Sequence, residues 1–407
     1  MTRQARWLSI VGIGEDGLDG LSPAARRLIA QAALVVGGAR HLKLAALAAE
    51  RTLAWPSPID GALPTILARR GEPVCVLASG DPFFYGVGAM LMRHIAADET
   101  VCLPAPSAFS LAAARLGWSL QDCTMLSLHG RALEAIIPHL QPRARLLALS
   151  WDRTTPAKLA QLLIARGMGR SKLVIGEALG GERERMRSAL ADELAFEEIA
   201  DLNTIALEIV AEPGARVIPR ASGLADSLFE HDGQITRREI RAMILAALAP
   251  RRGELLWDIG AGSGSVGIEW MLIDPANRAM AIERSPGRAA RIARNAAALG
   301  VPGLQIIEGD APAALAGLPP PDAIFVGGGA SNEGLLDYAY GALTSGGRLV
   351  VNAVTLQGQA ELARRFERQG GDLVQANIAR ADRVGRFHGW RSAMPVVQWS
   401  LQKPWPE

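Results

Sequence analysis

The 407-residue chain has little of what marks several large classes of protein. Its three cysteines, Cys75, Cys102 and Cys123, lie far apart and form no C-x-x-C pair, so the sequence predicts neither a disulfide framework nor a zinc site. We expect the thiols to be small buried hydrophobes, and we expect no bound metal. Aromatic residues make up only 5%, and the net charge is +2. No basic excess therefore indicates nucleic acid.

Long apolar runs are also missing. No run of about 18 apolar residues occurs, so we expect no membrane span. The apolar run near the N-terminus ends at Glu15 and Asp16, which does not fit a secretory signal peptide. We therefore expect a cytoplasmic protein. The length and the 49% of hydrophobic residues instead predict two globular domains of about 200 residues each.

The two halves alternate strand and helix signals, with a break at 212–219, where two prolines and a glycine interrupt the pattern. We predict domains at 1–212 and 223–407, joined by a linker at 213–222. The first half has a helix that begins at Ser22-Pro23 and strands expected at 8–11, 33–36, 74–77, 146–149, 173–175 and 205–210. The second half reads as a doubly wound α/β sheet. Its expected elements are a helix at 236–248, strands at 255–259, 278–282, 304–307, 323–326 and 348–352, and two strands near the C-terminus.

The most informative motif follows the strand at 255–259. Gly260, Gly262 and Gly264 stand at alternate positions after it, which lets the backbone turn sharply and approach a ligand closely. Asp258 precedes them and suits a ligand with amine and hydroxyl groups, such as S-adenosylmethionine. The last two glycines and Gly267 also spell G-x-G-x-x-G, so a nicotinamide dinucleotide is the alternative.

Further candidate residues follow the other expected strands, whose carboxyl ends meet at one edge of such a sheet. Glu283 would bind the ribose hydroxyls, Asp310 and Ala311 would meet the adenine, and Asp258 would reach the methionine portion. Gly327 opens a loop of three glycines that leaves room for a bulky, flat substrate. The two aspartates favour the methyl donor over the nicotinamide.

Basic side chains form two groups in the second half, and a solvated charged face is the alternative interpretation of each. Together they suit a polycarboxylate substrate, because guanidinium groups pair bidentately with carboxylates. The candidates are Arg237, Arg238 and Arg241 in the first group and Arg383, Arg386 and Arg391 in the second. The Pro-Pro-aromatic loop of nucleic-acid base methylases is absent. An RNA or protein methyltransferase with an N-terminal recognition domain remains the alternative function.

The second half resembles the decarboxylating methyltransferases of corrin (vitamin B12) synthesis, which have a Rossmann-like fold. The matching segments are 235–241, 258–269, 325–329 and 349–355. Asn352-Ala-Val-Thr355 is the distinctive part, and Asn352 is its candidate for contact with the substrate. This resemblance implies methylation at carbon 15 and decarboxylation.

The first half resembles the tetrapyrrole methylases, whose α/β domain has two lobes. The matching segments are 11–17, 78–86, 104–110, 127–131 and 176–180. The resemblance implies methylation at carbon 5 and assigns donor binding to Gly80, Asp81, Pro82, Tyr85, Ser107 and His129. From the residues alone, a turn after a strand is the favoured interpretation of 80–82. The G-x-G-x-x-G at 12–17 lacks an acid after the next strand, which weakens a dinucleotide site there.

Together the two matches cover nearly the whole chain, which is similar to the family of fused precorrin-6Y methyltransferases. That resemblance implies S-adenosyl-L-methionine as methyl donor, a small-molecule tetrapyrrole substrate, loss of carbon dioxide from the ring C acetate to give precorrin-8x, and a homo-oligomer. It implies no nucleic-acid or membrane partner. For the proton that replaces carbon dioxide, His231 and His388 are the only candidates, although a lone histidine is more often structural.

Overall fold

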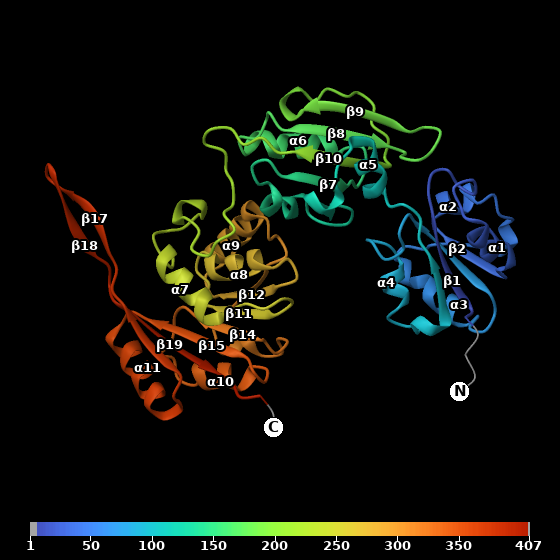
Figure 1. Cartoon of the computed structure of the whole chain (residues 1–407). Coiled ribbons are helices and arrows are strands. Elements are labelled where there is room, and N and C mark those ends of the chain that lie inside the picture. Colours follow the sequence, from blue (N-terminus) through green and yellow to red (C-terminus); the bar gives the residue numbers. More distant parts are fainter. Residues whose placement is uncertain (1–5, 406–407) are drawn as a thin grey trace. The chain divides into compact units, whose positions relative to one another are not determined.

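The computed structural model describes residues 6–405. The start of the N-terminal segment weighed as a signal peptide, residues 1–5, lies outside the described residues. Contacts divide the chain into two compact units, the first holding residues up to 133 and 139–217, and the second holding 134–138 and 218–407 (Figure 1). Across the described part of the chain, every helix is too short or too polar to cross a bilayer.

The first unit begins with a five-stranded sheet in the order β3-β2-β4-β1-β5, and all its neighbouring strands are parallel. Ser22 accepts a hydrogen bond from the backbone N–H of Ala25, and Pro23 follows, so the predicted helix start is confirmed. The elements are β1 (Leu8–Ile13), α1 (Pro23–Gln31), β2 (Leu34–Gly37), α2 (Ala39–Leu44), β3 (Thr52–Ala54), α3 (Leu63–Leu67), β4 (Val74–Ser79), α4 (Gly88–Leu91) and β5 (Thr100–Leu103).

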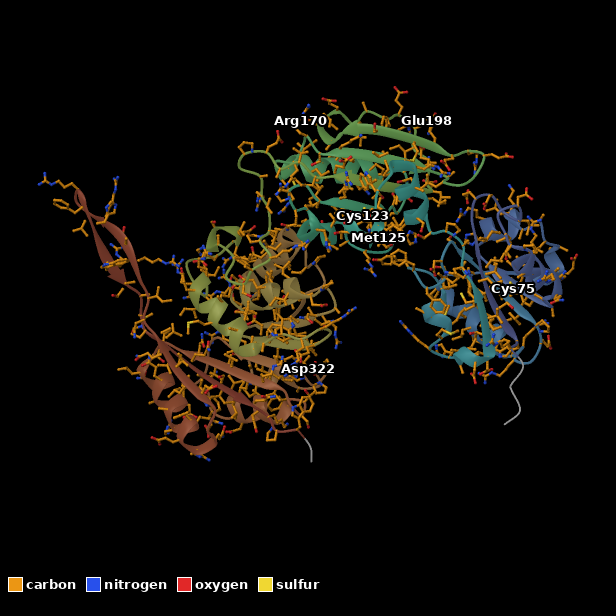
Figure 2. The ribbon with its side chains drawn as sticks, viewed as in Figure 1. Cys75, Cys123, Met125, Arg170, Glu198 and Asp322 are labelled. Carbon is orange, nitrogen blue, oxygen red and sulfur yellow. The ribbon has the colours of Figure 1, made fainter. Side chains whose placement is uncertain are left out.

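A second, mixed sheet follows in the same unit, in the order β6-β7-β10-β8-β9. Its elements are α5 (Ala108–Leu116), β6 (Cys123–Ser127), β7 (Arg145–Leu149), α6 (Thr155–Ala165), β8 (Lys172–Glu177), β9 (Arg185–Leu190) and β10 (Asn203–Glu208). Two successive sheets confirm the predicted two-lobed domain. Figure 2 labels Cys75 on β4 and Cys123 on β6. Only Cys75 is fully buried, so the expectation of buried thiols is wrong for Cys102 and Cys123, which are half-buried.

The second unit contains a seven-stranded sheet in the order β13-β12-β11-β14-β15-β19-β16. Six of its strands run in the same direction, and β19 runs antiparallel to its neighbours β15 and β16. This confirms the predicted doubly wound sheet, whose switch point lies between β11 and β14. The elements are α7 (Arg238–Leu248), β11 (Leu255–Ile259), α8 (Ser265–Ile273), β12 (Arg278–Glu283), α9 (Pro286–Leu299), β13 (Gln305–Glu308), β14 (Ala323–Val326), α10 (Leu335–Ala342), β15 (Arg348–Ala353), α11 (Leu356–Gln369), β16 (Asp372–Ala376) and β19 (Val396–Gln402).

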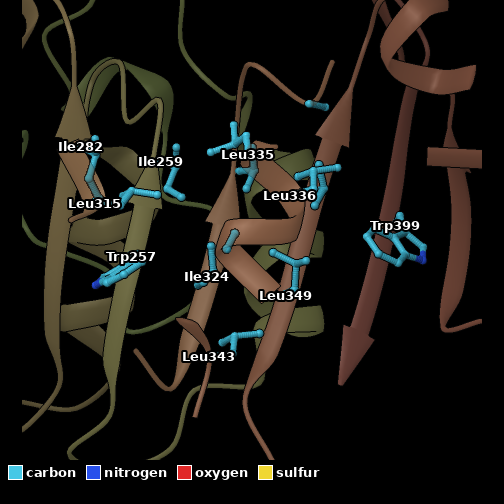
Figure 3. Close-up of a cluster of buried hydrophobic side chains, with 14 of the residues drawn as sticks. Trp257, Ile259, Ile282, Leu315, Ile324, Leu335, Leu336, Leu343, Leu349 and Trp399 are labelled. Carbon is cyan, nitrogen blue, oxygen red and sulfur yellow. The ribbon is translucent and has the colours of Figure 1, made fainter. Parts of the chain in front are cut away.

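One face of this sheet packs against α10 and α11 (Figure 3). Trp257 and Trp399 lie fully buried in this layer, in the same cluster as Leu335 and Leu336 of α10. Each buried leucine contributes about 1.5–3 kcal/mol through apolar burial. Alternate residues of the strands face α7, α8 and α9 on the other side. Both faces are covered, so the carboxyl edge of the sheet is left for a ligand.

A two-stranded hairpin, β17 (Ala379–Val384) and β18 (Phe387–Ser392), interrupts the end of the chain. The two strands pair only with each other, and Figure 1 shows them projecting from the rest of the second unit. The sequence predicted two strands near the C-terminus, and the structure has four. The hairpin was missed because its side chains are exposed on both faces, so no buried stripe marks it.

Candidate functional site

The glycine loop after β11 is shaped by left-handed backbone at alternate positions. At Gly264, with φ +76°, an added Cβ would lie 2.7 Å from Cγ2 of Ile292 in α9, so only glycine fits. At Gly262, with φ +61°, an added Cβ would have nothing nearer than 3.9 Å. Gly262 therefore presents bare backbone to open space, as the sequence predicts for close approach of a ligand.

Glu283 ends β12 and lies against this loop, with 5% of its surface exposed. Its Oε2 accepts a hydrogen bond from the backbone N–H of Gly262 at 2.9 Å, and its Oε1 accepts one from Ser285 at 3.0 Å. Each carboxylate oxygen keeps a further lone pair. A pocket of about 440 Å³ opens here, and Asp232 and Arg288 also line it. The acid is thus placed to accept hydroxyl groups of a ligand.

Asp258 lies beneath the loop, with 1% of its surface exposed. Its Oδ2 accepts a hydrogen bond from the backbone N–H of Gly267, in the first turn of α8, at 2.9 Å. Burial raises the pKa of Asp258 to about 7, and the nearby charge of Glu283 acts in the same direction. The expectation that Asp258 reaches the donor is corrected, because this carboxyl group braces α8 and is closed off from the pocket.

The remaining predicted donor residues lie at neighbouring strand ends. Asp310 follows β13, is largely exposed, and comes within 3.9 Å of Arg284. Ala311 beside it is half-buried. The backbone N–H of Gly327 donates to the carbonyl of Ile259 at 2.9 Å, so the loop after β14 is tied to the end of β11. The ends of β11, β12, β13 and β14 therefore form one edge, as predicted.

Arg241 does not belong to a substrate surface, which corrects the sequence interpretation. Its side chain is fully buried in α7, and its Nε donates to Oε1 of Glu269 at 2.5 Å. Its other nitrogens bond Asp226 at 3.2 Å and the carbonyls of Leu224 and Thr236. Each of its three guanidinium nitrogens thus donates within the protein, and Arg241 joins the two ends, or neck, of the loop 224–236.

The other predicted arginines are divided between two places. Arg237 and Arg238 lie exposed at the start of α7, and Arg237 pairs with Asp226 at 3.2 Å. The second group, Arg383, Arg386 and Arg391, lies exposed on the hairpin β17–β18. The hairpin strands form no part of the central sheet, but Arg380 of β17 pairs with Glu239 of α7 at 2.6 Å. The hairpin therefore contacts the helix that carries the first group, and the expectation that both groups flank one crevice stays a prediction.

The two candidate histidines are also exposed and lie apart. His388 stands on the hairpin, and Nδ1 of His231 accepts a hydrogen bond from the backbone N–H of Gly233 at 3.1 Å. His231 thereby shapes a turn of the loop 224–236. The role of either histidine as proton donor stays a prediction.

In the first unit, the predicted donor residues gather at the ends of β4 and β5. Gly80 has φ +55°, and an added Cβ would lie 2.8 Å from Cα of Ser107. Oδ1 of Asp81 accepts from the backbone N–H of Phe83 at 2.8 Å, and Pro82 between them is buried. Ser107 caps α5 by accepting from Ser110 at 3.1 Å. The structure thus brings together residues that the sequence separates by 27 positions.

Tyr85 and His129 complete this set. Tyr85 has φ +57° and is 45% exposed, and its hydroxyl donates to the carbonyl of Met125 on β6 at 3.3 Å. Its ring lies 5.1 Å from that of Phe84, centre to centre. His129 is exposed in the turn after β6. An exposed aromatic group at a strand end is consistent with a binding surface.

Two buried polar residues of the second unit have structural positions that their sequence did not reveal. Asn295, in α9, is 2% exposed and bonds the backbone of both Glu230 and Ser263. Gln398, in β19, is 7% exposed and is the register partner of Asn352. Sequence reasoning missed Gln398. The sequence signal that could have revealed it is a single amide residue, Gln398, between the valines and the tryptophan of a buried strand.

Comparison with known proteins places both units. Residues 8–195 match the family described as tetrapyrrole (corrin/porphyrin) methylases, and residues 227–403 match the precorrin methyltransferase domain. A Sinorhizobium protein named precorrin-6Y C(5,15)-methyltransferase [decarboxylating] is 56% identical over 398 residues, which cover 98% of this chain and 96% of that protein.

Two relatives from Salmonella typhimurium match shorter stretches. A cobalt-precorrin-7 C(5)-methyltransferase is 36% identical over 44% of this chain and 88% of its own length. A cobalt-precorrin-6B C(15)-methyltransferase (decarboxylating) is 31% identical over 44% of this chain and 96% of its own length. The relative that is similar along nearly the whole chain decides the matter: this chain belongs to the family of decarboxylating precorrin-6Y C(5,15)-methyltransferases.

Proposed function

We propose that this chain is a bifunctional C-methyltransferase of cobalamin biosynthesis. It converts precorrin-6Y to precorrin-8x by methylating carbons 5 and 15 and removing the ring C acetate carboxylate. The observation that carries this proposal is the 56% identity, over 98% of the chain, with a fused enzyme of that name. Its substrate partner is a small tetrapyrrole, and we expect a homo-oligomer in the cytoplasm with no nucleic-acid or membrane partner.

S-adenosyl-L-methionine fits the edge of the second unit as methyl donor and supplies an electrophilic methyl group on a sulfonium. Gly262 offers backbone without a side chain, and the free lone pairs of Glu283 suit the two ribose hydroxyls. Asp310, exposed at the next strand end, suits the amine of adenine. An acid at the position of Glu283 would also bind the ribose of a dinucleotide, so Asp310 rather than Glu283 favours the methyl donor here.

The residues of the site act mainly by position. Methyl transfer needs the donor carbon in line with the accepting carbon and the exclusion of water. Bridging carbons beside pyrrole nitrogens are enamine-like nucleophiles, so no strong base is needed. We assign carbon 15 and decarboxylation to the second unit. Carbon 5 falls to the first unit, where Gly80, Asp81 and Ser107 lie together.

Product analysis tests this function. The full chain, incubated with precorrin-6Y and S-adenosylmethionine, is expected to give a product with two added methyl groups and one carboxylate fewer by mass spectrometry. An unchanged tetrapyrrole, together with methylation of RNA or protein, would show that the alternative function is correct.

A further inference from the structure

Two amide side chains, Asn352 and Gln398, lie side by side at the carboxyl end of β15. They are opposite each other in the register of β15 and β19, so their side chains point to the same face of the sheet. Arg348, four residues earlier on β15, reaches the carbonyl of Leu248 in α7 from this face. Both amides are more than nine-tenths buried.

Among the residues that the structure describes, the side-chain oxygens of these two amides have no hydrogen-bond donor beside them. Within residues 6–405, Oδ1 of Asn352 and Oε1 of Gln398 are enclosed and accept no hydrogen bond. Leaving such groups unsatisfied costs free energy that an apolar side chain of the same size would not incur. Within the same described residues the two amide nitrogens donate no hydrogen bond, and they are not enclosed as the oxygens are, so they can donate to a ligand.

The pair borders the loop of three glycines. Val326 of β14 is the register partner of Val351, so Asn352 lies one residue further, beside Gly327. An added Cβ at Gly328 would have no atom within 4 Å, so open space adjoins the loop. This is where the sequence left room for a flat substrate.

We propose, resting on the function proposed above, that Asn352 and Gln398 hold the acetate carboxylate that is lost as carbon dioxide. In this step the bond between the methylene carbon and the carboxyl carbon breaks, and its electron pair passes to a ring imine of the substrate. A proton from water then replaces carbon dioxide on that carbon.

The absence of net charge on the two amides is what suits them to this step. The carboxylate charge disappears from the group as the bond breaks, so a guanidinium partner would stabilise the reactant more than the transition state. Neutral N–H donors orient the carboxylate while stabilising the charged reactant less than a guanidinium would. The arginine on the same face, Arg348, is already paired with Glu254 at 2.5 Å.

The test uses Gln398→Met and Asn352→Leu in the full chain. We expect each variant to decarboxylate at least about ten-fold more slowly, the loss typical of a hydrogen bond to a charged group. Affinity for S-adenosylhomocysteine should stay unchanged, and the melting temperature should stay equal or rise because an unsatisfied polar group is gone. The matched control is Gln402→Met, on the same strand and face, whose Nε2 donates to the carbonyl of Gly346 at 3.3 Å. It should decarboxylate normally.

A charged variant distinguishes binding of the carboxylate by Asn352 and Gln398 from a role of these residues in packing alone. Gln398→Lys should lower KM for the tetrapyrrole and also lower kcat for loss of carbon dioxide. Normal decarboxylation by Gln398→Met and Asn352→Leu, or a loss that parallels a lower melting temperature and weaker S-adenosylhomocysteine binding, would overturn the proposal. If the unaltered chain releases no carbon dioxide, the proposed function itself is wrong. If only the two variants behave differently from expectation, the function stands and the role of Asn352 and Gln398 is wrong.

Discussion

At the scale of single residues, Glu283 and Asp258 have different roles because only Glu283 lines the pocket. Glu283 is reached from the pocket and keeps lone pairs for a ligand, whereas Asp258 is sealed beneath the loop. Burial, together with the nearby charge of Glu283, raises the pKa of Asp258 to about 7. Asp258 is therefore expected to hold its proton to a higher pH than an exposed aspartate.

Asp258 should make stability depend on pH. Its folded pKa of about 7 lies above the value near 3.9 of an unfolded chain, so the folded state binds more protons between these pH values. The free energy of unfolding should therefore fall as pH rises from about 4 to about 7, by up to about 1.4 kcal/mol per pH unit. Asp258→Asn keeps an acceptor for Gly267 and should remove this fall. Denaturant unfolding at several pH values measures it, and an equal slope in both proteins would contradict the assignment.

At the scale of elements, the loop 224–236 is fixed to α7 and α9 by hydrogen bonds and ion pairs. Arg241 bonds its two neck carbonyls, and Asp232 pairs with Arg288 and Arg291 of α9 at 3.1 and 3.0 Å. Asn295 joins the loop at Glu230 to the glycine loop at the carbonyl of Ser263. The loop thereby forms one wall of the pocket that contains Glu283.

Loosening this wall should weaken donor binding. Asn295→Ala removes three hydrogen bonds of a buried side chain, and we expect affinity for S-adenosylhomocysteine at the second unit to fall about ten-fold or more. The matched control is Arg294→Ala, which removes only an exposed ion pair with Glu230 and should change affinity less than two-fold. Calorimetric titration measures both. Equal affinities in the two variants would show that the loop does not shape the site.

At the scale of the whole molecule, the sequence predicted the fold where hydrophobic periodicity is strong. The strands at 255–259 and 323–326 were placed to the residue, because continuous apolar runs mark strands buried on both faces. The exposed hairpin at 379–392 and the strands β3, β5, β6 and β9 were not among the expected strands, because none of them is buried along its whole length. Residue types did not reveal the burial of Arg241 or of Asp258, since burial depends on which helix face meets the sheet.

Two donor sites on one chain have a direct consequence for binding. Calorimetry should find two molecules of S-adenosylhomocysteine per chain and no binding of NAD, because each unit has its own glycine turn at a strand end. The separated segments 1–212 and 223–407 should each bind one. If 1–212 binds none, the first unit has no donor site of its own.

The central claim, that each unit performs its own methylation, is tested most directly by mixing two variants. Glu283→Ala removes the acid at the second site, and Asp81→Ala alters the first. Neither variant alone should form the doubly methylated, decarboxylated product, whereas the mixture should, because each supplies the unit that the other lacks. Mass spectrometry of the tetrapyrrole after incubation with precorrin-6Y gives the answer. Full product from either variant alone, or none from the mixture, would contradict the account.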